Sequence, residues 1–555
     1  MAIVRRLYLY AIAGITLAML LGALITLINL ALQIAFGRSD PLFGSPESAI
    51  RSQLSLALAT IAVALPVWAI HWTIAERSLR SPAGEAERRS AVRALYLTLV
   101  LLGLLGALVV TGTEIVTYVL VVLLGGETPS MIQVLLPIGA ALVAGVFFAY
   151  HAWIRHRDLR TEMSGAAAWL PRVYLYLAML IGLFTMLYGI VQLIALAGEA
   201  LGLGGSGVLV GTVGRPLALV GAFQGIVVGF VLWLVHWAYG VRLLETRDWR
   251  GSAEKGSRTR AGYFVIVILA GAGWFLYQLS VALATVLTSL LNPSDVTAGD
   301  LVRSAAGAIV VGLVFAGVWW AHRLALIGER RASGPAAQLS ARRVDAYAVM
   351  TLALSSGAIA LAWLVGLALD VAGRGGRTLG GGATWKPELA IFLSAAIVAA
   401  ILWLLELRQV QRWRSADAQA EARSTARRAY LLLAIAGALL AAVSALVVIL
   451  NRLIGSLIGA SVSGSLTSEL STPAGVVIVA VLVALLHFWW LRRDQRVHEP
   501  EAAGVVGPVL PAEPQLVPVQ VQMLALTLPV GADVGAAVSS LRTALPEGCR
   551  LDEAD

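Results

Sequence analysis

Charged residues are scarce in this sequence. Only 13% of its 555 residues are Asp, Glu, Lys or Arg, whereas soluble domains carry about 25%. Hydrophobic residues make up 59% of the chain, and its mean hydropathy is +0.83. Water cannot solvate a surface with so little charge. We therefore expect lipid to surround the chain, which excludes an ordinary soluble fold.

Cysteine and the motifs of soluble enzymes are also nearly absent. Cys549 is the one cysteine, so disulfides and cysteine-based metal sites within the chain are excluded. There is no phosphate-binding P-loop, no H-E-x-x-H and no G-x-S-x-G. The glycine-rich run at 373–382 falls in a loop that we place outside the cell. The sequence favours a protein that is not an enzyme, and it predicts no cofactor and no metal.

Long apolar runs are abundant instead. A membrane core about 30 Å thick needs about 20 apolar residues per helix, and lipid-exposed backbone must form its hydrogen bonds internally. We predict an all-α membrane protein with about twelve transmembrane helices. The first run follows Arg5 and Arg6, but it is too long for a signal peptide, so we expect it to be retained. The runs lie near 7–33, 53–75, 94–124, 131–154, 173–201, 214–240, 261–291, 302–325, 346–372, 387–408, 429–458 and 473–491.

Most basic residues lie in alternate connections. They gather at the N-terminus, after the last helix and in linkers such as 76–93 and 242–260. Basic connections remain in the cytoplasm, so we predict a multi-pass protein of the inner membrane with both termini cytoplasmic. These linkers should attract anionic lipid headgroups. The positive net charge is explained by this bias, and we predict no binding to nucleic acid.

Two marker series recur with a period near 84 residues, which indicates repeat architecture. We predict six helical hairpins as parallel repeats, grouped into four-helix units at 1–165, 166–335 and 336–499. In the third unit Glu406 stands where the other hairpins have histidine. A tyrosine opens each hairpin: Tyr8, Tyr96, Tyr174, Tyr263, Tyr347 and Tyr430. A polar residue closes it: His71, His151, His236, His322, Glu406 and His487.

The tail from 500 to 555 has a different composition. Residues 500–518 are rich in Pro, Ala and Val and predict a linker. Residues 519–528 alternate as in a strand, and 532–545 predict a helix that begins after Asp533. We predict a short, partial α/β-like cytoplasmic module, which could bind a protein partner.

The R-x-x-Y-L openings and aromatic-x-x-H-W closings resemble those of a bacterial family of multi-pass membrane proteins with a domain of unknown function, of the DUF 5671 type. The resemblance covers residues 1–499 as three successive four-helix units and leaves the tail out. It implies a protein of the bacterial inner membrane, and it implies no activity.

The histidines have three readings. Trp68, His71 and Trp72 share one helix face, beside the basic cytoplasmic boundary. The first reading is an interfacial hydrogen bond from each histidine to a backbone carbonyl or to the tyrosine of its own hairpin. The second is a ligand or proton site, because histidine titrates near neutral pH. The third is a metal or b-type haem site, although no pair of histidines is singled out.

Three polar residues within the apolar runs form a candidate intramembrane site: Glu114, Gln192 and Gln278. A carboxyl group in lipid is costly unless it is paired, so Glu114 is a functional candidate. The alternative is a protonated or threonine-paired side chain near the outer surface. Amides in membrane helices are commonly interhelical hydrogen-bonding groups.

Three functions follow from these observations. The leading hypothesis is a non-enzymatic membrane scaffold or accessory subunit, because the repeated markers are interfacial and the interior is poor in polar groups. The alternative is a small-molecule or ion transporter with a polar site that includes Glu114, in which Pro66 and Pro137 could break helices. A membrane-bound redox enzyme is the third.

Overall fold

The computed structural model describes residues 2–36, 46–82, 84–201, 215–291, 298–331, 334–373, 385–458 and 466–496. Within these ranges the regular structure is helical, and no strand is present. The chain divides into two compact parts, Met1–His498 and Glu499–Asp555. The predicted strand and helix of the tail, together with Cys549, lie outside the described residues.

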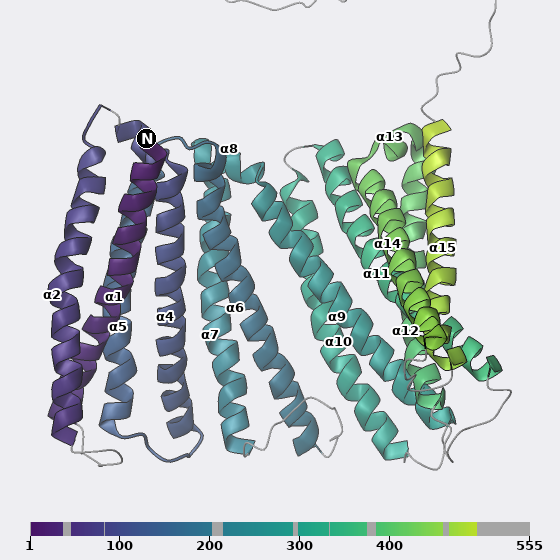
Figure 1. Cartoon of the computed structure of the whole chain (residues 1–555), viewed down its shortest axis with the longest axis horizontal. Coiled ribbons are helices and arrows are strands. Elements are labelled where there is room, and N and C mark those ends of the chain that lie inside the picture. The colour runs from purple at the N-terminus through teal and green to yellow at the C-terminus, as the bar shows by residue number, and fades with distance from the viewer. Residues whose placement is uncertain are drawn as a thin grey trace, which may run out of the picture. The chain divides into compact units, whose positions relative to one another are not determined.

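Twelve of the helices in the described ranges are long and apolar enough to cross a membrane. The protein is therefore a multi-pass membrane protein, as the sequence predicts. Figure 1 shows these helices side by side. They are α1 (Ala2–Phe36), α2 (Pro46–Ser78), α4 (Ala91–Leu123), α5 (Met131–Asp158), α6 (Gly165–Ala200), α7 (Arg215–Glu245), α9 (Arg258–Leu291), α10 (Ala298–Glu329), α11 (Pro335–Gly373), α12 (Trp385–Ala416), α14 (Thr425–Leu457) and α15 (Leu466–Arg496).

Three short helices recur in the series of long helices: α3 (Gly84–Arg88), α8 (Trp249–Lys255) and α13 (Ala418–Arg423). Each short helix lies between the second and third long helices of a group of four. We call α1–α5, α6–α10 and α11–α15 the first, second and third units. The ends of the long helices that adjoin α3, α8 and α13 are called the linker ends.

Contacts between units follow one pattern at both junctions. The third long helix of one unit packs against the first two helices of the next, so α4 contacts α6 and α7, and α9 contacts α11 and α12. Each long helix also packs against its partner in the sequence, as α6 does against α7.

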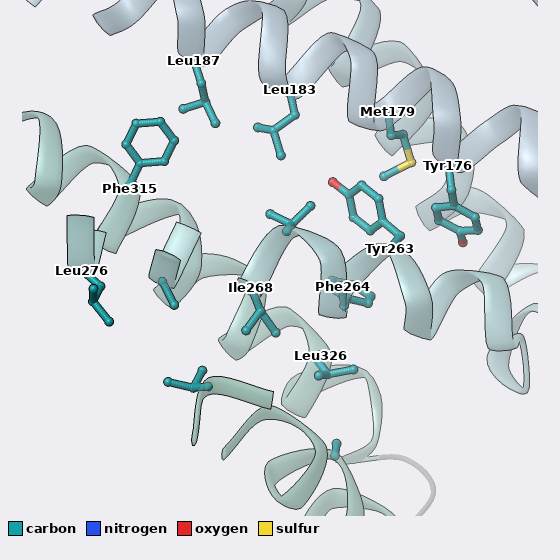
Figure 2. Packing of buried hydrophobic residues seen from close by; sticks show 14 of the residues in the cluster. Tyr176, Met179, Leu183, Leu187, Tyr263, Phe264, Ile268, Leu276, Phe315 and Leu326 are labelled. Carbon is teal, nitrogen blue, oxygen red and sulfur yellow. The ribbon is translucent and has the colours of Figure 1, made fainter. Parts of the chain in front are cut away.

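The largest buried apolar cluster extends across the second unit into its neighbours. In Figure 2, Met179, Leu183 and Leu187 of α6 lie near Ile268 of α9 and Phe315 of α10. Large apolar side chains are also common on exposed helix faces, which suits contact with lipid tails.

Helices α6 and α7 approach closely through glycine. A methyl group on Gly229 would lie 2.3 Å from the backbone nitrogen of Met186, and one on Gly189 would lie 2.5 Å from the carbonyl oxygen of Ala222. Gly221, by contrast, has open space around it. Pro66 and Pro137, considered above as helix breaks, lie inside the continuous helices α2 and α5.

Candidate functional site: charged networks at the linker ends

Two of the short helices, α8 and α13, begin at acidic caps. The Asp248 carboxylate accepts a hydrogen bond from the backbone nitrogen of Arg250 at 3.0 Å, and Asp417 accepts one from that of Ala420 at 2.8 Å. Such caps satisfy amide groups that have no partner within the helix. The Arg250 side chain also donates to Asp248 at 2.7 Å, and this hydrogen bond lowers the pKa of the Asp248 carboxyl.

One sequence pattern, E-x-x-S-x-x-R-x-x-Y, begins within each short helix and continues into the next long helix. It occupies 87–96, 254–263 and 421–430. The glutamate lies at or near the end of the short helix. The serine stands just before the next long helix, where Ser257 accepts a hydrogen bond from the Arg260 backbone at 3.2 Å. The arginine and tyrosine fall three residues apart and thus on one face of the long helix. This segment therefore brings four polar side chains to the linker end.

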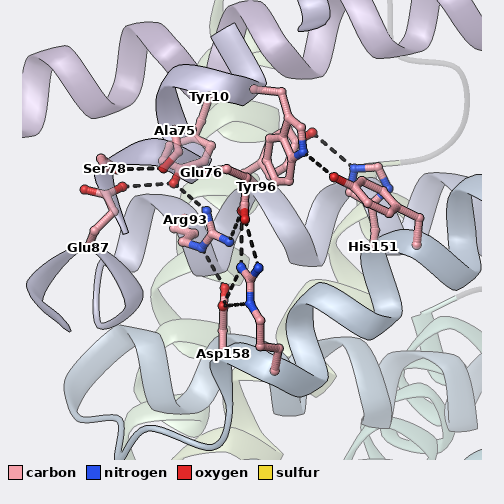
Figure 3. A network of polar contacts seen from close by, with 12 residues as sticks. Tyr10, Ala75, Glu76, Ser78, Glu87, Arg93, Tyr96, His151 and Asp158 are labelled. Carbon is pink, nitrogen blue, oxygen red and sulfur yellow. Dashed lines mark hydrogen bonds and ion pairs between the residues drawn. The ribbon is translucent and has the colours of Figure 1, made fainter. Parts of the chain in front are cut away.

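In the first unit, Arg93 is the centre of a buried network, shown in Figure 3. Its guanidinium donates to Asp158 at 2.6 Å, to Glu76 at 2.7 Å and to the Tyr10 hydroxyl at 3.0 Å. Tyr10 in turn donates to Glu87 at 2.9 Å. The Arg93 side chain is only 1% exposed. One guanidinium thus connects α1, α2, α4 and α5.

Corresponding networks occur in the other two units. In each, an arginine on the first helix donates to the glutamate of the short helix, at 2.7–2.8 Å. A tyrosine four residues later donates to the same carboxylate, and the second arginine donates to that tyrosine and to an acid at the end of the fourth helix. We call each set a charged network. The sets are Arg6, Tyr10, Glu87, Arg93 and Asp158; Arg172, Tyr176, Glu254, Arg260 and Glu329; and Arg343, Tyr347, Glu421, Arg427 and Asp494.

Each charged network is electrically balanced, with two arginines and two carboxylates. Glu76 and Arg157 add one further charge of each sign in the first unit, where they pair at 2.9 Å. Burying a charge costs several kcal/mol unless it is paired and hydrogen-bonded. In these networks each carboxylate is paired with an arginine. The connecting tyrosine donates a hydrogen bond to the glutamate and accepts one from the second arginine. The arrangement holds helix ends together, and the charges cancel within each set of five residues. In the third unit, Arg414 also lies 3.4 Å from Asp494.

Tyrosine–histidine pairs lie beside the networks. Each histidine Nδ1 is 2.8 Å from the carbonyl oxygen four residues earlier. A carbonyl only accepts, so Nδ1 carries the proton and Nε2 accepts from the tyrosine hydroxyl. The pairs are Tyr8–His71 at 3.4 Å, Tyr96–His151 at 3.3 Å, Tyr174–His236 and Tyr263–His322 at 3.1 Å, and Tyr430–His487 at 2.9 Å.

The sequence assignment of Tyr347 is wrong. Tyr347 donates to Glu421 at 2.6 Å and accepts from Arg427 at 3.1 Å, so it corresponds to Tyr10 and Tyr176 rather than to the histidine-paired tyrosines. The misassignment arose because two tyrosines stand two residues apart in the first two units, whereas the third unit keeps only one.

In the third unit, Asp345 occupies the position of the histidine-paired tyrosine, and Glu406 replaces the histidine. Arg323, on α10 of the second unit, lies 2.7 Å from Asp345 and 3.0 Å from Glu406. Asp345 is completely buried, and Glu406 is 6% exposed. An arginine from the neighbouring unit therefore pairs with both carboxylates, although its single positive charge balances only one of them.

The three candidate intramembrane residues do not form a common site. Glu114 is exposed on α4, Gln192 donates to the Tyr188 hydroxyl at 2.8 Å on its own helix, and Gln278 is buried on α9. Among the described residues, no hydrogen bond or ion pair joins any two of the three. In the same part of the chain, no group of three or more His, Cys, Asp and Glu could hold a metal ion.

Sequence reasoning missed most of the charged networks. It singled out an arginine three residues before the tyrosine in four of the six copies, but neither the glutamate six residues before the second arginine of each network nor the acid seven residues after the last histidine of each unit. Both spacings are identical in all three units. Comparing the copies position by position, rather than by one marker, could have found them.

The same three copies appear in a comparison with protein families. The model of the domain of unknown function DUF5671 matches residues 6–146, 172–313 and 343–482. The chain belongs to this family. Each DUF5671 match begins at or beside the first arginine of a charged network: Arg6, Arg172 or Arg343. No curated protein and no solved structure matches the chain.

Proposed function

We propose that this DUF5671 protein is a non-enzymatic membrane scaffold or accessory subunit. It would lie in the bacterial inner membrane with the linker ends and both termini in the cytoplasm. Its six hairpins would be parallel repeats grouped into units at 1–165, 166–335 and 336–499. Basic linkers would contact anionic lipid headgroups, and the tail from 500 to 555 would be available to a protein partner.

The charged networks carry this proposal. Their arginines and acids bind one another, and the tyrosine–histidine pairs are likewise closed within their own hairpins. A site for chemistry or transport needs polar groups that converge on a ligand. In all three units, the arginines, acids and tyrosines of the charged networks instead bind one another at the linker ends. Such an arrangement fixes helix positions and suits a rigid framework.

One observation favours transport as the second candidate. Asp345 and Glu406 place two buried carboxylates beside the single guanidinium of Arg323. An acid inside a membrane bundle is often part of an ion or proton pathway. These two acids would supply the polar site of a small-molecule or ion transporter, and Glu114, exposed on α4, would be a separate polar position along the pathway.

A flux measurement separates the two functions. The full chain is reconstituted in vesicles that contain a pH-sensitive dye, and proton and cation flux are driven by an imposed gradient. The scaffold predicts flux no greater than in empty vesicles. Transport predicts flux that falls on substitution Asp345→Asn, whereas Tyr277→Phe, on an exposed part of α9, serves as the control and leaves flux unchanged.

A second measurement tests the scaffold directly. Mild detergent extraction from native membranes, followed by cross-linking and mass determination, should find the chain in a stoichiometric assembly with another membrane protein. A chain that is extracted alone and catalyses flux in vesicles would overturn the scaffold proposal.

A further inference from the structure

The junction between the first and second units contains two arginines without carboxylate partners. Arg155 lies near the end of α5, and Arg88 ends α3. Nη1 of Arg155 and Nε of Arg88 are buried and have no hydrogen-bond partner. Neither side chain forms an ion pair with any residue that the structure describes. Arg155 instead lies over the Tyr174 ring, 4.4 Å from its centroid.

The nearby acids are already engaged. Asp158 accepts from Arg93 at 2.6 Å and from Arg157 at 3.0 Å. Glu254, on the other side of Arg155, accepts from Arg172 at 2.8 Å and from a tyrosine. A guanidinium group remains charged in proteins. Arg88 and Arg155 therefore add two positive charges to a region whose other charges are balanced.

The two arginines line the same small cavity. Its volume is about 20 Å³, and Arg93, Asp158, Met163 and Pro171 complete much of its wall. A second cavity of about 40 Å³, between Arg155, Arg172 and Trp249, adjoins the other side of the Arg155 side chain. A space of about 10–15 Å³ is enough for one water-sized atom. The first cavity thus has room for a single anionic atom beside the Arg88 and Arg155 side chains. The Asp158 carboxylate, which accepts from two other arginines, also belongs to its wall.

We propose that this junction binds an anionic group, either one oxygen of a phosphate or a chloride ion, between Arg88 and Arg155. Guanidinium groups bind phosphate oxygens by charge-assisted hydrogen bonds. The cavity lies at the linker end, where basic pockets between membrane helices meet lipid phosphates if that end is cytoplasmic. The source of the anion is therefore a lipid headgroup or a free inorganic ion.

Comparison of the three units identifies a substitution of Arg155 that should still allow the chain to fold. The residues that follow the paired histidine by four positions are Arg155 in the first unit, Leu326 in the second and Leu491 in the third. Leucine at this position is thus compatible with the fold, so Arg155→Leu removes the charge and replaces the contact of the guanidinium with the Tyr174 ring by an apolar one. Arg323→Gln is the matched control, because it removes a junction arginine that has carboxylate partners.

The test measures thermal unfolding of the delipidated full chain in neutral detergent, with phosphate or chloride titrated against gluconate at constant ionic strength. Wild type should be stabilised by one of these anions, with an affinity about tenfold or more above that of Arg155→Leu, because a charge-assisted hydrogen bond contributes about 1.5–3 kcal/mol. The Arg323→Gln variant should keep the response. An equal response of wild type and Arg155→Leu would overturn the proposal and indicate general charge screening.

A second experiment, with lipid, determines whether the anion is a lipid headgroup or a free ion. Nanodiscs of phosphatidylcholine are compared with nanodiscs that also contain phosphatidylglycerol, and native mass spectrometry counts the phospholipid retained. Retention by wild type and several-fold loss in Arg155→Leu would assign the anion to a lipid headgroup. A response to inorganic anions alone would assign it to a free ion. No difference between wild type and Arg155→Leu in either arm would overturn the proposal and leave water in the cavity.

Discussion

At the residue scale, the protein depends on buried arginines that have several partners. Arg427 donates to Asp494 at 2.5 and 3.2 Å and to Tyr347 at 3.1 Å. Its arginine counterparts in the other units make equivalent contacts. A buried ion pair contributes little relative to an apolar replacement, but removal of one partner leaves an unpaired buried charge. Single substitutions in the networks should therefore be far more harmful than those on the surface.

Substitution Arg427→Gln tests this asymmetry. We expect the free energy of unfolding to fall by about 3–5 kcal/mol, because Asp494 loses its principal buried partner. Denaturant unfolding in detergent measures the change. Arg89→Gln is the control, since Arg89 pairs with Glu85 where both side chains are exposed, and such pairs contribute about 0–1 kcal/mol. Similar losses in the two variants would contradict the role of the network.

The tyrosine–histidine pairs allow a second residue-scale prediction. The Tyr263 hydroxyl bonds to His322 at 3.1 Å and accepts from Trp233 at 3.2 Å. Substitution Tyr263→Phe leaves Nε2 of the buried His322 and Nε1 of the half-buried Trp233 without this partner, which should lower stability by about 1–3 kcal/mol. The control, Tyr277→Phe, alters a tyrosine on the same helix that is 56% exposed. If both variants unfold like wild type, the hydroxyl has no structural role.

At the element scale, glycine sets the distance between α6 and α7. Gly182 and Gly189 on α6 meet Gly225 and Gly229 on α7 with no space for added side chains. Close packing replaces the hydrophobic effect between helices in lipid. The sequence showed small residues on several helices but not which of them face a partner.

Substitution Gly229→Ala should separate this pair. The new methyl group would lie 2.3 Å from the Met186 backbone nitrogen, and overpacking costs about 1–3 kcal/mol. The melting temperature should fall. Gly221→Ala, one of the other α7 glycines, has open space and should leave the melting temperature unchanged or slightly raised, because alanine favours helix. A lower melting temperature for Gly221→Ala than for Gly229→Ala would mean that α6 and α7 pack through another face.

Composition and periodicity were sufficient to predict the number of membrane helices, because lipid requires long apolar helices. They also located the histidines and the tyrosines that bond to five of them. They could not assign Tyr347 or detect the role of Arg323, because those contacts depend on which unit lies beside which. A polar residue such as Glu406 has the same sequence signature whether its partner is in its own hairpin or in the next unit.

At the scale of the whole molecule, the third unit is adapted to the second. Asp345 and Glu406 stand where the other units have tyrosine and histidine, and Arg323 stands where the first unit has Ala152. The double variant Asp345→Tyr/Glu406→His restores the repeat but leaves Arg323 without its two carboxylates.

The double variant should therefore be destabilised by several kcal/mol, as expected for an unpaired buried charge. Adding Arg323→Ala should recover most of the loss, because the three changes together reproduce the junction between the first and second units. Unfolding of the double and triple variants measures the coupling. Equal stability of the two would show that Arg323 does not connect the units.

The bridge made by Arg323 also bears on how such a gene can change. Repeated coding segments invite unequal recombination, which deletes or adds a whole copy. Loss of the last copy would remove the two carboxylates that pair with Arg323, and a first copy inserted in its place would set tyrosine and histidine against it. The stability of the folded chain therefore depends on the order of the copies and not on their number alone.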